Sequence, residues 1–492
     1  MSYDAEVPRS SSAQELVAST EALPGTSQPQ SRAGFSGRMV AALVALSIAQ
    51  FLVALDYSII YVALPSIGSG LGLPADRLQW VVSGYALFFA SFLVVGGRAA
   101  DLTGPRRLFL WALLLFGAGS LAGGISGNLW LLVAARAAQG IGAAALTPSM
   151  LALISATFPA GALRSRALAI WGALGAVGLA AGVLIGGALT AELSWRWVFF
   201  VNVPLVAATF LLAARVLPAG QRTGISVREL NIPGAALFTS AILSVVFALT
   251  EAAGAGWTSL STLAFLAGFV VLGGIWLAHD RRPSVTPLID PALLRIRSLA
   301  GGGLMSALYM ASVGAEFFLI TLFLQDQRGY GPLAAGLAFL PLALCVVAGN
   351  LVTGRLTEPL GIRATLATGF GVGAVGLALL GLGVHAHSYW PGVLPGLVVS
   401  GLGQGMAFAG MYIAGTKDVQ DSAQGTAAAI LTTTQYTGGA LGLAILVLVL
   451  GKTPSEGSFG NAYTVTVCVA AAAVVCALLT LGHHSTDSRK GA

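Results

Sequence analysis

Three ionisable residues lie well inside long apolar stretches of the sequence, namely Asp56, Arg136 and Glu316. Ionisable side chains are costly inside a hydrophobic segment, and those that occur there commonly belong to ion or proton pathways. Burial disfavours the charged form of a carboxyl group, so Asp56 and Glu316 are candidates to bind and release a proton. Arg136 does not usefully deprotonate, and we expect it to stabilise a charged carboxylate, with Asp56 as its partner.

Each of these residues also has a purely structural interpretation. Asp56 precedes Pro65 by nine positions and could sit at a helix end that reaches interfacial water. Glu316 could make a structural hydrogen bond to a neighbouring helix. Arg136 could be a fixed counter-ion that joins its own helix to the helix of Asp56.

Aromatic and amide side chains on the same apolar stretches are candidates to bind a small molecule. Aromatic faces close to an acid suit lipophilic cations, although aromatic residues in membrane helices also pack against other helices or lipid. The candidates are Tyr57, Tyr61, Gln139, Tyr309, Phe317, Gln404, Phe408, Tyr412 and Gln435.

Cofactor chemistry is not indicated. Three cysteines, Cys345, Cys468 and Cys476, fall within apolar stretches and read as small core residues. The five histidines lack the spacing of a zinc site within one helix. Gly451-Lys452-Thr453 resembles the end of a phosphate-binding loop, but Leu446 stands where its first glycine belongs. We therefore expect no metal, no cofactor and no enzyme activity.

The elements that carry these groups are predicted to be membrane-spanning helices. Hydrophobic residues make up 56% and charged residues 9% of the 492 residues, whereas soluble domains have about 25% charged residues. Apolar stretches of roughly 20 residues recur, each long enough to cross a bilayer as a helix. The net charge of +6 therefore does not indicate nucleic-acid binding. We expect about fourteen spans, at 39–63, 79–97, 108–127, 130–154, 168–190, 198–216, 232–251, 260–278, 299–323, 334–354, 365–384, 393–414, 425–450 and 461–481.

An even number of spans places both termini on the same side of the membrane. Most of the 25 Lys and Arg residues then fall on the cytoplasmic side if the N-terminus is cytoplasmic, as the positive-inside bias requires. Arg77, Arg196, Arg328 and Lys452 are the exceptions outside the membrane. Arginine outnumbers lysine and Ala and Gly are abundant, which is typical of a GC-rich bacterium. We expect a bacterial plasma-membrane protein with cytoplasmic termini.

A polar, glycine-punctuated turn at 97–107 returns at 354–363 with a constant shift, since 354 − 97 = 257 and 361 − 104 = 257. Such a repeat predicts two halves on one plan, with six spans each, two inserted spans between them and a binding site between the halves near the midplane. The expected domains are a disordered tail at 1–37, halves at 38–216 and 298–482, a linker with the two inserted helices at 217–297, and a tail at 483–492. The paired positions are Gly97, Asp101, Gly104 and Arg106 with Gly354, Glu358, Gly361 and Arg363.

Several motifs in the expected order resemble those of the major facilitator superfamily, specifically its fourteen-span drug:proton antiporter family. They are the stretch 55–65 at the end of span one, Gln79-Trp80 with Tyr85 in span two, 136–142 in span four and 195–204 before span six. The resemblance implies a monomeric exporter of amphipathic, cationic or aromatic drugs that exchanges them for protons by alternating access, with Arg136 tied to proton transfer. Two alternatives stay open, namely export of an endogenous metabolite or self-made antibiotic, and proton-coupled uptake.

The sequence departs from the family pattern at two gating positions. Span five has glycines at helical spacing, including Gly182, Gly186 and Gly187, but Val183 stands where the family motif has proline. The resemblance implies that this proline seals the cavity, whereas ordinary glycine packing is the structural alternative. In the turn at 97–107, the family's basic positions hold Leu102 and Pro105.

We expect the turn at 97–107 to form a clasp, that is, a contact between the two halves that closes the cytoplasmic side. Its remaining polar groups would make this contact. Asp101 could cap a helix N-terminus or pair with an arginine of the facing half. Arg106 and Arg107 would assist, with Glu358 and Arg363 as counterparts in the second copy. The alternative is a basic loop that only sets the topology.

Overall fold

The computed structural model describes residues 35–159, 162–218, 231–282, 285, 287–289, 291–386, 388–420, 424–451 and 454–480, and all regular structure within them is helical. Fourteen segments of this part of the chain are long and apolar enough to cross a membrane, which confirms the all-α fold. The expected tails fall largely or wholly outside the described residues, and so does most of the basic linker after 217. The domain boundaries at 216/217 and 297/298 stay a prediction.

The first half contains six spans. They are α1 (Gly37–Leu71), α2 (Ala75–Thr103), α3 (Pro105–Gly124), α4 (Leu129–Thr157), α5 (Ala162–Glu192) and the pair α6 (Trp197–Phe200) and α7 (Asn202–Val216). The inserted spans are α8 (Ile232–Ala255) and α9 (Leu260–Asp280), and the short α10 (Pro291–Leu294) follows.

The second half begins with a span of four pieces. A short α-helix, α12 (Ala315–Leu322), lies between two π-helical segments, η2 (Met310–Gly314) and η3 (Phe323–Gln327), and α11 (Arg297–Tyr309) precedes them. A π-helix holds an extra residue in its turn and is frequent at functional sites. The remaining helices are α13 (Pro332–Ala338), α14 (Leu340–Gly383), α15 (Tyr389–Gly392), α16 (Leu394–Thr416), α17 (Gln424–Leu450) and α18 (Glu456–Thr480).

The second glycine of each repeated turn lies where one span ends and the next begins, whereas Gly97 and Gly354 lie inside α2 and α14. Gly104 separates α2 from α3 with a φ of 84°, and Pro105 then occupies the first helical position, where its missing N–H costs nothing. Gly361 takes a φ of 74° inside α14, which is therefore two spans joined at a kink. Both conformations favour glycine, which explains why the repeat retains one at each position.

The outer surface of the bundle is suited to lipid. The inserted helix α9 is almost wholly exposed, with Val270 68% accessible. Exposed tryptophans lie near span ends, where their amphipathic rings suit the headgroup region. They include Trp111, Trp130, Trp197, Trp257 and Trp390.

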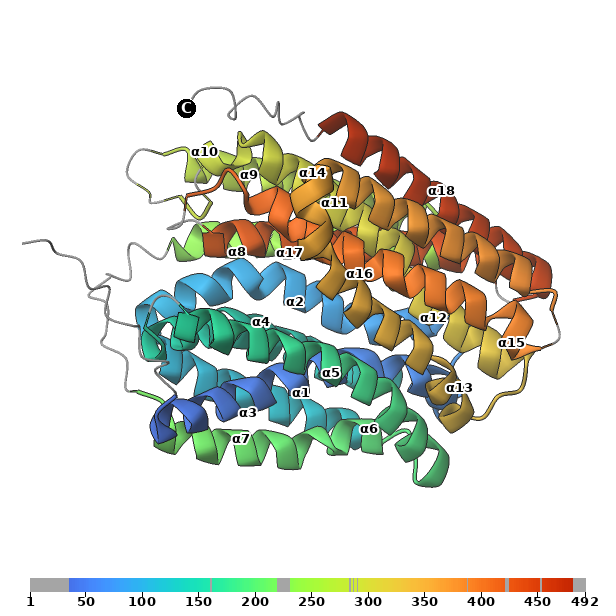
Figure 1. Ribbon diagram of the computed structural model, residues 1–492, viewed down its shortest axis with the longest axis horizontal. Helices are drawn as coiled ribbons and strands as arrows, with labels where there is room; N and C mark the ends of the chain where they lie inside the picture. The colour runs from blue at the N-terminus through green and yellow to red at the C-terminus, as the bar shows by residue number, and fades with distance from the viewer. Residues whose placement is uncertain are drawn as a thin grey trace, which may run out of the picture.

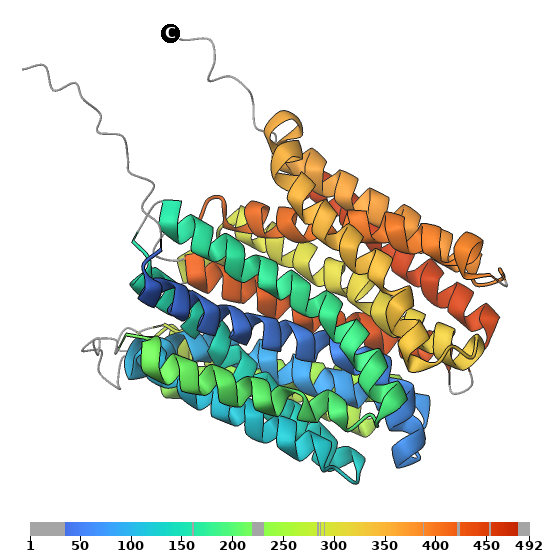
Figure 2. The same ribbon diagram turned by 60° about the horizontal axis from the view of Figure 1, so that its bottom comes forward.

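Helices α1 to α7 lie together in the lower part of Figure 1, and most of the helices from α11 to α18 lie above them, whereas α13 lies level with α5 at the lower right. The halves meet where α2 packs along α17 and where α5 packs against α13, while α1 also touches α12. The inserted helix α8 contacts both α2 and α17, so it covers one edge of this seam. Figure 2 shows the same two groups of helices from below.

Span five uses its glycines at two different interfaces. A Cβ added at Gly182 would lie 2.1 Å from the Ser58 hydroxyl of α1, so the two helices are in close contact there. A Cβ at Gly187 would lie 2.7 Å from the carbonyl oxygen of Pro332 in the second half. A Cβ at Gly336 of α13 would likewise lie 2.7 Å from the carbonyl oxygen of Val183. The glycines thus join α5 both to its own half and to the other half, at the end expected to face outward.

Candidate transport site

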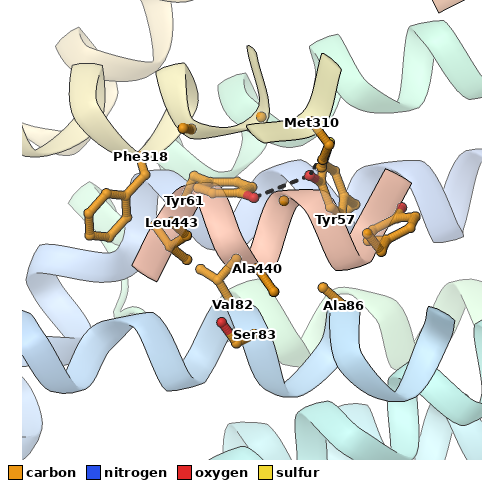
Figure 3. Close-up of a pocket in the computed structure, with 13 residues that line it drawn as sticks. Tyr57, Tyr61, Val82, Ser83, Ala86, Met310, Phe318, Ala440 and Leu443 are labelled. Atoms are coloured by element: carbon orange, nitrogen blue, oxygen red, sulfur yellow. Dashed lines mark hydrogen bonds between the residues drawn. The ribbon is translucent and has the colours of Figure 1, made fainter. Parts of the chain in front are cut away.

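A small cavity lies between the two halves, bounded by α1, α2, η2, α12 and α17 (Figure 3). Its volume is about 30 Å³, which holds one or two water molecules. Its lining carries no charged side chain among the described residues. The lining residues are Tyr57, Tyr61, Val82, Ser83, Ala86, Met310, Gly314, Ala315, Phe318, Tyr436, Gly439, Ala440 and Leu443.

Tyrosines and a methionine give the cavity its chemical character. The Tyr61 hydroxyl donates to the Tyr57 hydroxyl over 3.2 Å, and the Tyr57 hydroxyl lies 3.9 Å from the sulfur of Met310 (Figure 3). The Tyr436 ring meets that of Tyr57 edge to face with centroids 6.1 Å apart. Aromatic faces with a few hydroxyls, in walls otherwise made of small apolar residues, suit an amphipathic ring system.

Two of the nine substrate candidates, Tyr57 and Tyr61, line the cavity. Phe317 lies behind Tyr61, and its ring stacks on that of Phe339 with centroids 5.5 Å apart. Gln435 donates weakly to the sulfur of Met310 over 3.9 Å. These side chains form one continuous cluster around the cavity.

The other candidates lie elsewhere. Tyr412 accompanies Gln435, whose amide oxygen accepts from the Tyr412 hydroxyl over 3.1 Å. Tyr309 packs against Phe408, which is 37% exposed. Gln139 and Gln404 are each hydrogen-bonded to an acid.

Asp56 is buried inside the first half at 1% exposure. Its Oδ2 accepts from Arg136 Nη1 over 2.6 Å, and its Oδ1 accepts from Gln139 Nε2 and Asn202 Nδ2, each over 2.7 Å. Because α1 continues through Pro65 to Leu71, Asp56 lies far from a helix end, contrary to the interfacial interpretation. Three donors and one fixed positive charge leave this carboxylate fully paired.

The Asp56 cluster joins five helices of the first half. Arg136 of α4 also donates from Nε to the carbonyl of Val81 in α2, over 3.2 Å, and lies 4.5 Å from the centre of the Tyr85 ring. Gln139 reaches the Ser120 hydroxyl of α3 over 2.9 Å, and Asn202 belongs to α7. One buried ion pair and its hydrogen bonds thus connect these helices.

Glu316 is buried inside the second half with no exposed surface. Its Oε2 accepts from the Ser400 hydroxyl over 2.5 Å and from Gln404 Nε2 over 2.7 Å, both on α16. Among the described residues, no cation forms an ion pair with Glu316, and its Oε1 has no hydrogen-bond partner. The two acids therefore have opposite surroundings.

Neither acid lines the cavity. Each points into its own half, while a neighbouring residue on the same helix, Tyr57 or Ala315, contributes to the cavity wall. Successive residues of a helix point about 100° apart, so a side chain beside a cavity residue can face a different helix. The acids flank the cavity from within the two bundles.

The repeated turns lie at the end expected to face the cytoplasm. Arg106 Nη2 donates to the carbonyl of Ala214 over 2.5 Å, so it binds α7 of its own half and not the facing half. Arg107 is exposed and Arg363 is half-buried. The side chains of Asp101 and Glu358 lie outside what the structure describes, and the clasp stays a prediction.

Sequence reasoning missed several polar partners of the acids and part of the cavity wall. Ser120, Asn202 and Ser400 were not candidates because hydroxyl and amide residues are common in membrane helices. A signal was present for the two glutamines, since Gln139-Gly140-Ile141 returns as Gln404-Gly405-Met406 in the corresponding span. The missed cavity residues include Met310 and Tyr436.

In the part of the chain that the structure describes, two similar halves of six membrane-length spans each, with two inserted spans and a cavity between the halves, define a polytopic membrane transporter. The chain belongs to the major facilitator superfamily, since the sequence model of that family matches residues 46–443. It is 36% identical over 453 residues to the cephamycin export protein of Amycolatopsis lactamdurans, covering 90% of this chain and 93% of that protein. It is also 36% identical over 463 residues to the puromycin resistance protein of Streptomyces alboniger, with 91% of each covered.

Solved structures agree with the fold. A peptide transporter POT in complex with sulfate superposes with a TM-score of 0.67 at 17% identity, covering 90% of this chain and 96% of that one. A variant of the nucleoside transporter NupG gives 0.64 at 14% identity, covering 90% and 100%. At this level of identity the likeness concerns the fold alone.

Proposed function

We propose that this chain exports amphipathic, aromatic small molecules of the antibiotic or drug kind in exchange for protons, by alternating access. The export and resistance names of its relatives support the direction of transport. The tyrosine-lined cavity between the halves supports the substrate class. We place the chain in the bacterial plasma membrane as a monomer with both termini in the cytoplasm.

The observation that carries proton coupling is the isolation of Glu316. A buried carboxylate without a cation is unfavourable in hydrocarbon surroundings, so the site favours the neutral, protonated form. Ser400 and Gln404 donate to Oε2 and moderate the cost when the proton leaves. Glu316 can therefore change charge during a cycle, whereas Asp56 keeps its charge beside Arg136.

Coupling between proton and substrate would run through α12. Glu316 faces α16, while Ala315 and Phe318 of the same helix line the cavity. A change in the Glu316 site therefore moves part of the cavity wall. Proton and substrate need not compete for the same atom, and the inward proton gradient would supply the energy.

Positive charge on the substrate would be recognised by aromatic faces. Because the cavity lining carries no acid among the described residues, a cation would rest on the rings of Tyr57, Tyr61 or Tyr436. Neutral aromatic compounds would bind through the same rings. A broad substrate range is expected because the cavity wall has few side chains that can form hydrogen bonds.

Transport by purified protein in proteoliposomes tests the function. Liposomes with an imposed pH gradient are loaded with puromycin or a fluorescent aromatic cation, and its movement is followed in wild type, Glu316→Gln and the control Glu456→Gln. We expect the gradient to drive transport in wild type and the control, and Glu316→Gln to lose the gradient-driven component. Gradient-driven transport at the wild-type rate in Glu316→Gln would contradict coupling at this residue.

Export of a self-made antibiotic is the second candidate, favoured by the similarity to a cephamycin export protein. A drug-susceptibility panel in a pump-deficient host separates a broad range from a single compound. Uptake is tested in the same cells, because dissipating the proton gradient raises the accumulation of an exported dye and lowers that of an imported one.

A further inference from the structure

Two buried polar atoms in the second half have no hydrogen-bond partner among the described residues, namely Glu316 Oε1 and the Tyr463 hydroxyl. Glu316 has no exposed surface and Tyr463 of α18 is 1% exposed. Buried polar groups are nearly always paired, so each unpaired one requires an explanation. These two atoms belong to side chains that interact electrostatically.

Helix α12, which carries Glu316, packs against α18, which carries Tyr463. The Phe323 and Phe459 rings meet edge to face with centroids 5.5 Å apart. Glu316 precedes Phe323 by seven residues and Tyr463 follows Phe459 by four, and both spacings keep residues on one face of a helix. Helices α12 and α18 run in opposite directions across the bundle. Glu316 and Tyr463 therefore lie on the same side of the contact between Phe323 and Phe459.

Ser400 and Gln404 both donate to Oε2 of Glu316, which leaves Oε1 as the position for the exchangeable proton. Because both groups bind Oε2, neither is an acceptor for a proton on Oε1. A phenol beside Oε1 would serve both charge states, because its oxygen accepts and its hydrogen donates. Tyr463 is thus suited to both charge states of the acid.

We propose that Tyr463 is the positioning residue for the exchangeable proton of Glu316, its hydroxyl pairing with Oε1 directly or through one buried water. It accepts from the protonated carboxyl and donates to the carboxylate. The inference rests on the proposed function, in which Glu316 is the proton-coupling acid.

Few other groups influence this site. Among the described residues, the titratable side chains that interact with Glu316 are Tyr309 on α11 and Tyr463 on α18. The facing residues of α16 are Ser400 and Gln404, which do not titrate in this range. On α1 and α17, the tyrosines next to α12 lie at the cavity, and the Asp56 ion pair lies in the other half.

Removing the Tyr463 hydroxyl should shift the pH profile of transport in one predictable direction. Hydrogen bonds to a charged acceptor are stronger than those to a neutral group. Without the hydroxyl, the charged form of Glu316 therefore loses more stabilisation than the protonated form. Tyr463→Phe should therefore hold the proton more tightly and move the pH profile of proton-driven transport upward by about one unit. The substrate KM should stay unchanged because Tyr463 does not line the cavity.

The experiment compares Tyr463→Phe with Tyr309→Phe in proteoliposomes. Initial rates are measured across pH for wild type and both variants, and thermal unfolding checks their folding. Tyr309→Phe is the matched control, because it also removes a buried hydroxyl that interacts with Glu316. An upward shift confined to Tyr463→Phe supports the proposal, and identical profiles for wild type and Tyr463→Phe overturn it.

Glu316→Gln separates failure of this inference from failure of the proposed function. If Glu316→Gln keeps wild-type proton-driven transport, the proposed coupling itself is wrong. If Glu316→Gln loses that transport while Tyr463→Phe matches wild type, only the role of Tyr463 is wrong. Substrate exchange without a proton gradient should persist in all these variants, and adding Tyr463→Phe to Glu316→Gln should change nothing further.

Discussion

Gln139 and Gln404 make the same hydrogen bond in the two halves, since each Nε2 donates over 2.7 Å to a buried acid, Asp56 or Glu316. The halves differ three residues earlier, where Arg136 precedes Gln139 and Gly401 precedes Gln404. A Cβ at Gly401 would lie 2.7 Å from the carbonyl of Leu342, so an arginine has no room there. Asp56 in the first half is paired with the cation of Arg136, whereas Glu316 in the second half has no such partner among the described residues.

The ion pair of the first half should contribute mainly to stability. Arg136→Gln leaves Asp56 buried without its counter-ion, and we expect the free energy of unfolding to fall by about 3–5 kcal/mol. The double variant Arg136→Gln with Asp56→Asn should recover part of this loss, because no charge remains unpaired. Thermal unfolding in detergent measures both, and equal stability of the single and double variants would contradict the structural role.

Asp56→Asn should reduce transport of cationic and neutral substrates to the same extent. The carboxylate does not line the cavity, so it cannot distinguish substrate charge by contact. Efflux of one cationic and one neutral compound in the same cells measures the ratio. A selective loss of the cation would show that Asp56 reaches the substrate.

Removing an aromatic wall of the cavity should weaken binding. Tyr61→Ala deletes a ring that contributes roughly 0.5–1.5 kcal/mol of stacking, so we expect KM to rise about three- to tenfold for aromatic substrates. Phe408→Ala is the control, because Phe408 is absent from the cavity lining. The concentration dependence of transport gives both values, and equal KM changes in the two variants would exclude a direct role for Tyr61.

The contact between α5 and α13 should set how readily the outer end opens. Gly187→Val places a side chain against the carbonyl of Pro332 and should separate the halves there. Gly172→Val is the control on the same helix, since nothing lies within 4 Å of a Cβ at Gly172. In a cysteine-free background, Leu333→Cys should react faster with an impermeant maleimide in the Gly187 variant only.

The segment after the inserted helices is held to α2 by Arg98. Its Nη2 donates to the carbonyls of Pro287, over 2.5 Å, and Leu288, over 3.3 Å, while Leu288 N donates to Asp280 Oδ2 over 2.9 Å. Arg98→Ala should therefore raise hydrogen exchange at Leu288, since the carbonyl contacts that fix the segment are lost. Arg107→Ala is the control, because Arg107 is exposed. Equal hydrogen exchange at Leu288 in Arg98→Ala and Arg107→Ala would show that Arg98 does not hold the segment.

The spans could be predicted because about 20 apolar residues must cross the hydrocarbon, whatever they touch. The direction of each side chain around its helix could not. Gln139 and Gln404 were expected at the substrate, yet they bind the two acids. The prediction failed because a helix that is apolar on every face gives no periodic signal of which face points where. The two π-helical segments beside α12 likewise have no sequence signature.

Those π-helical segments bear on how the chain can be re-engineered. Met310–Gly314 and Phe323–Gln327 each hold a residue more per turn than the α-helix between them. A π turn and an α turn each complete one full rotation, so deleting the extra residue of the first segment would keep α12 facing α16, whereas deleting a residue from the regular helix α11 would turn α12 by about 100°. Glu316 would leave Ser400 and Gln404 only in the second case, so the first π-helical segment is where this span can be shortened without losing these contacts.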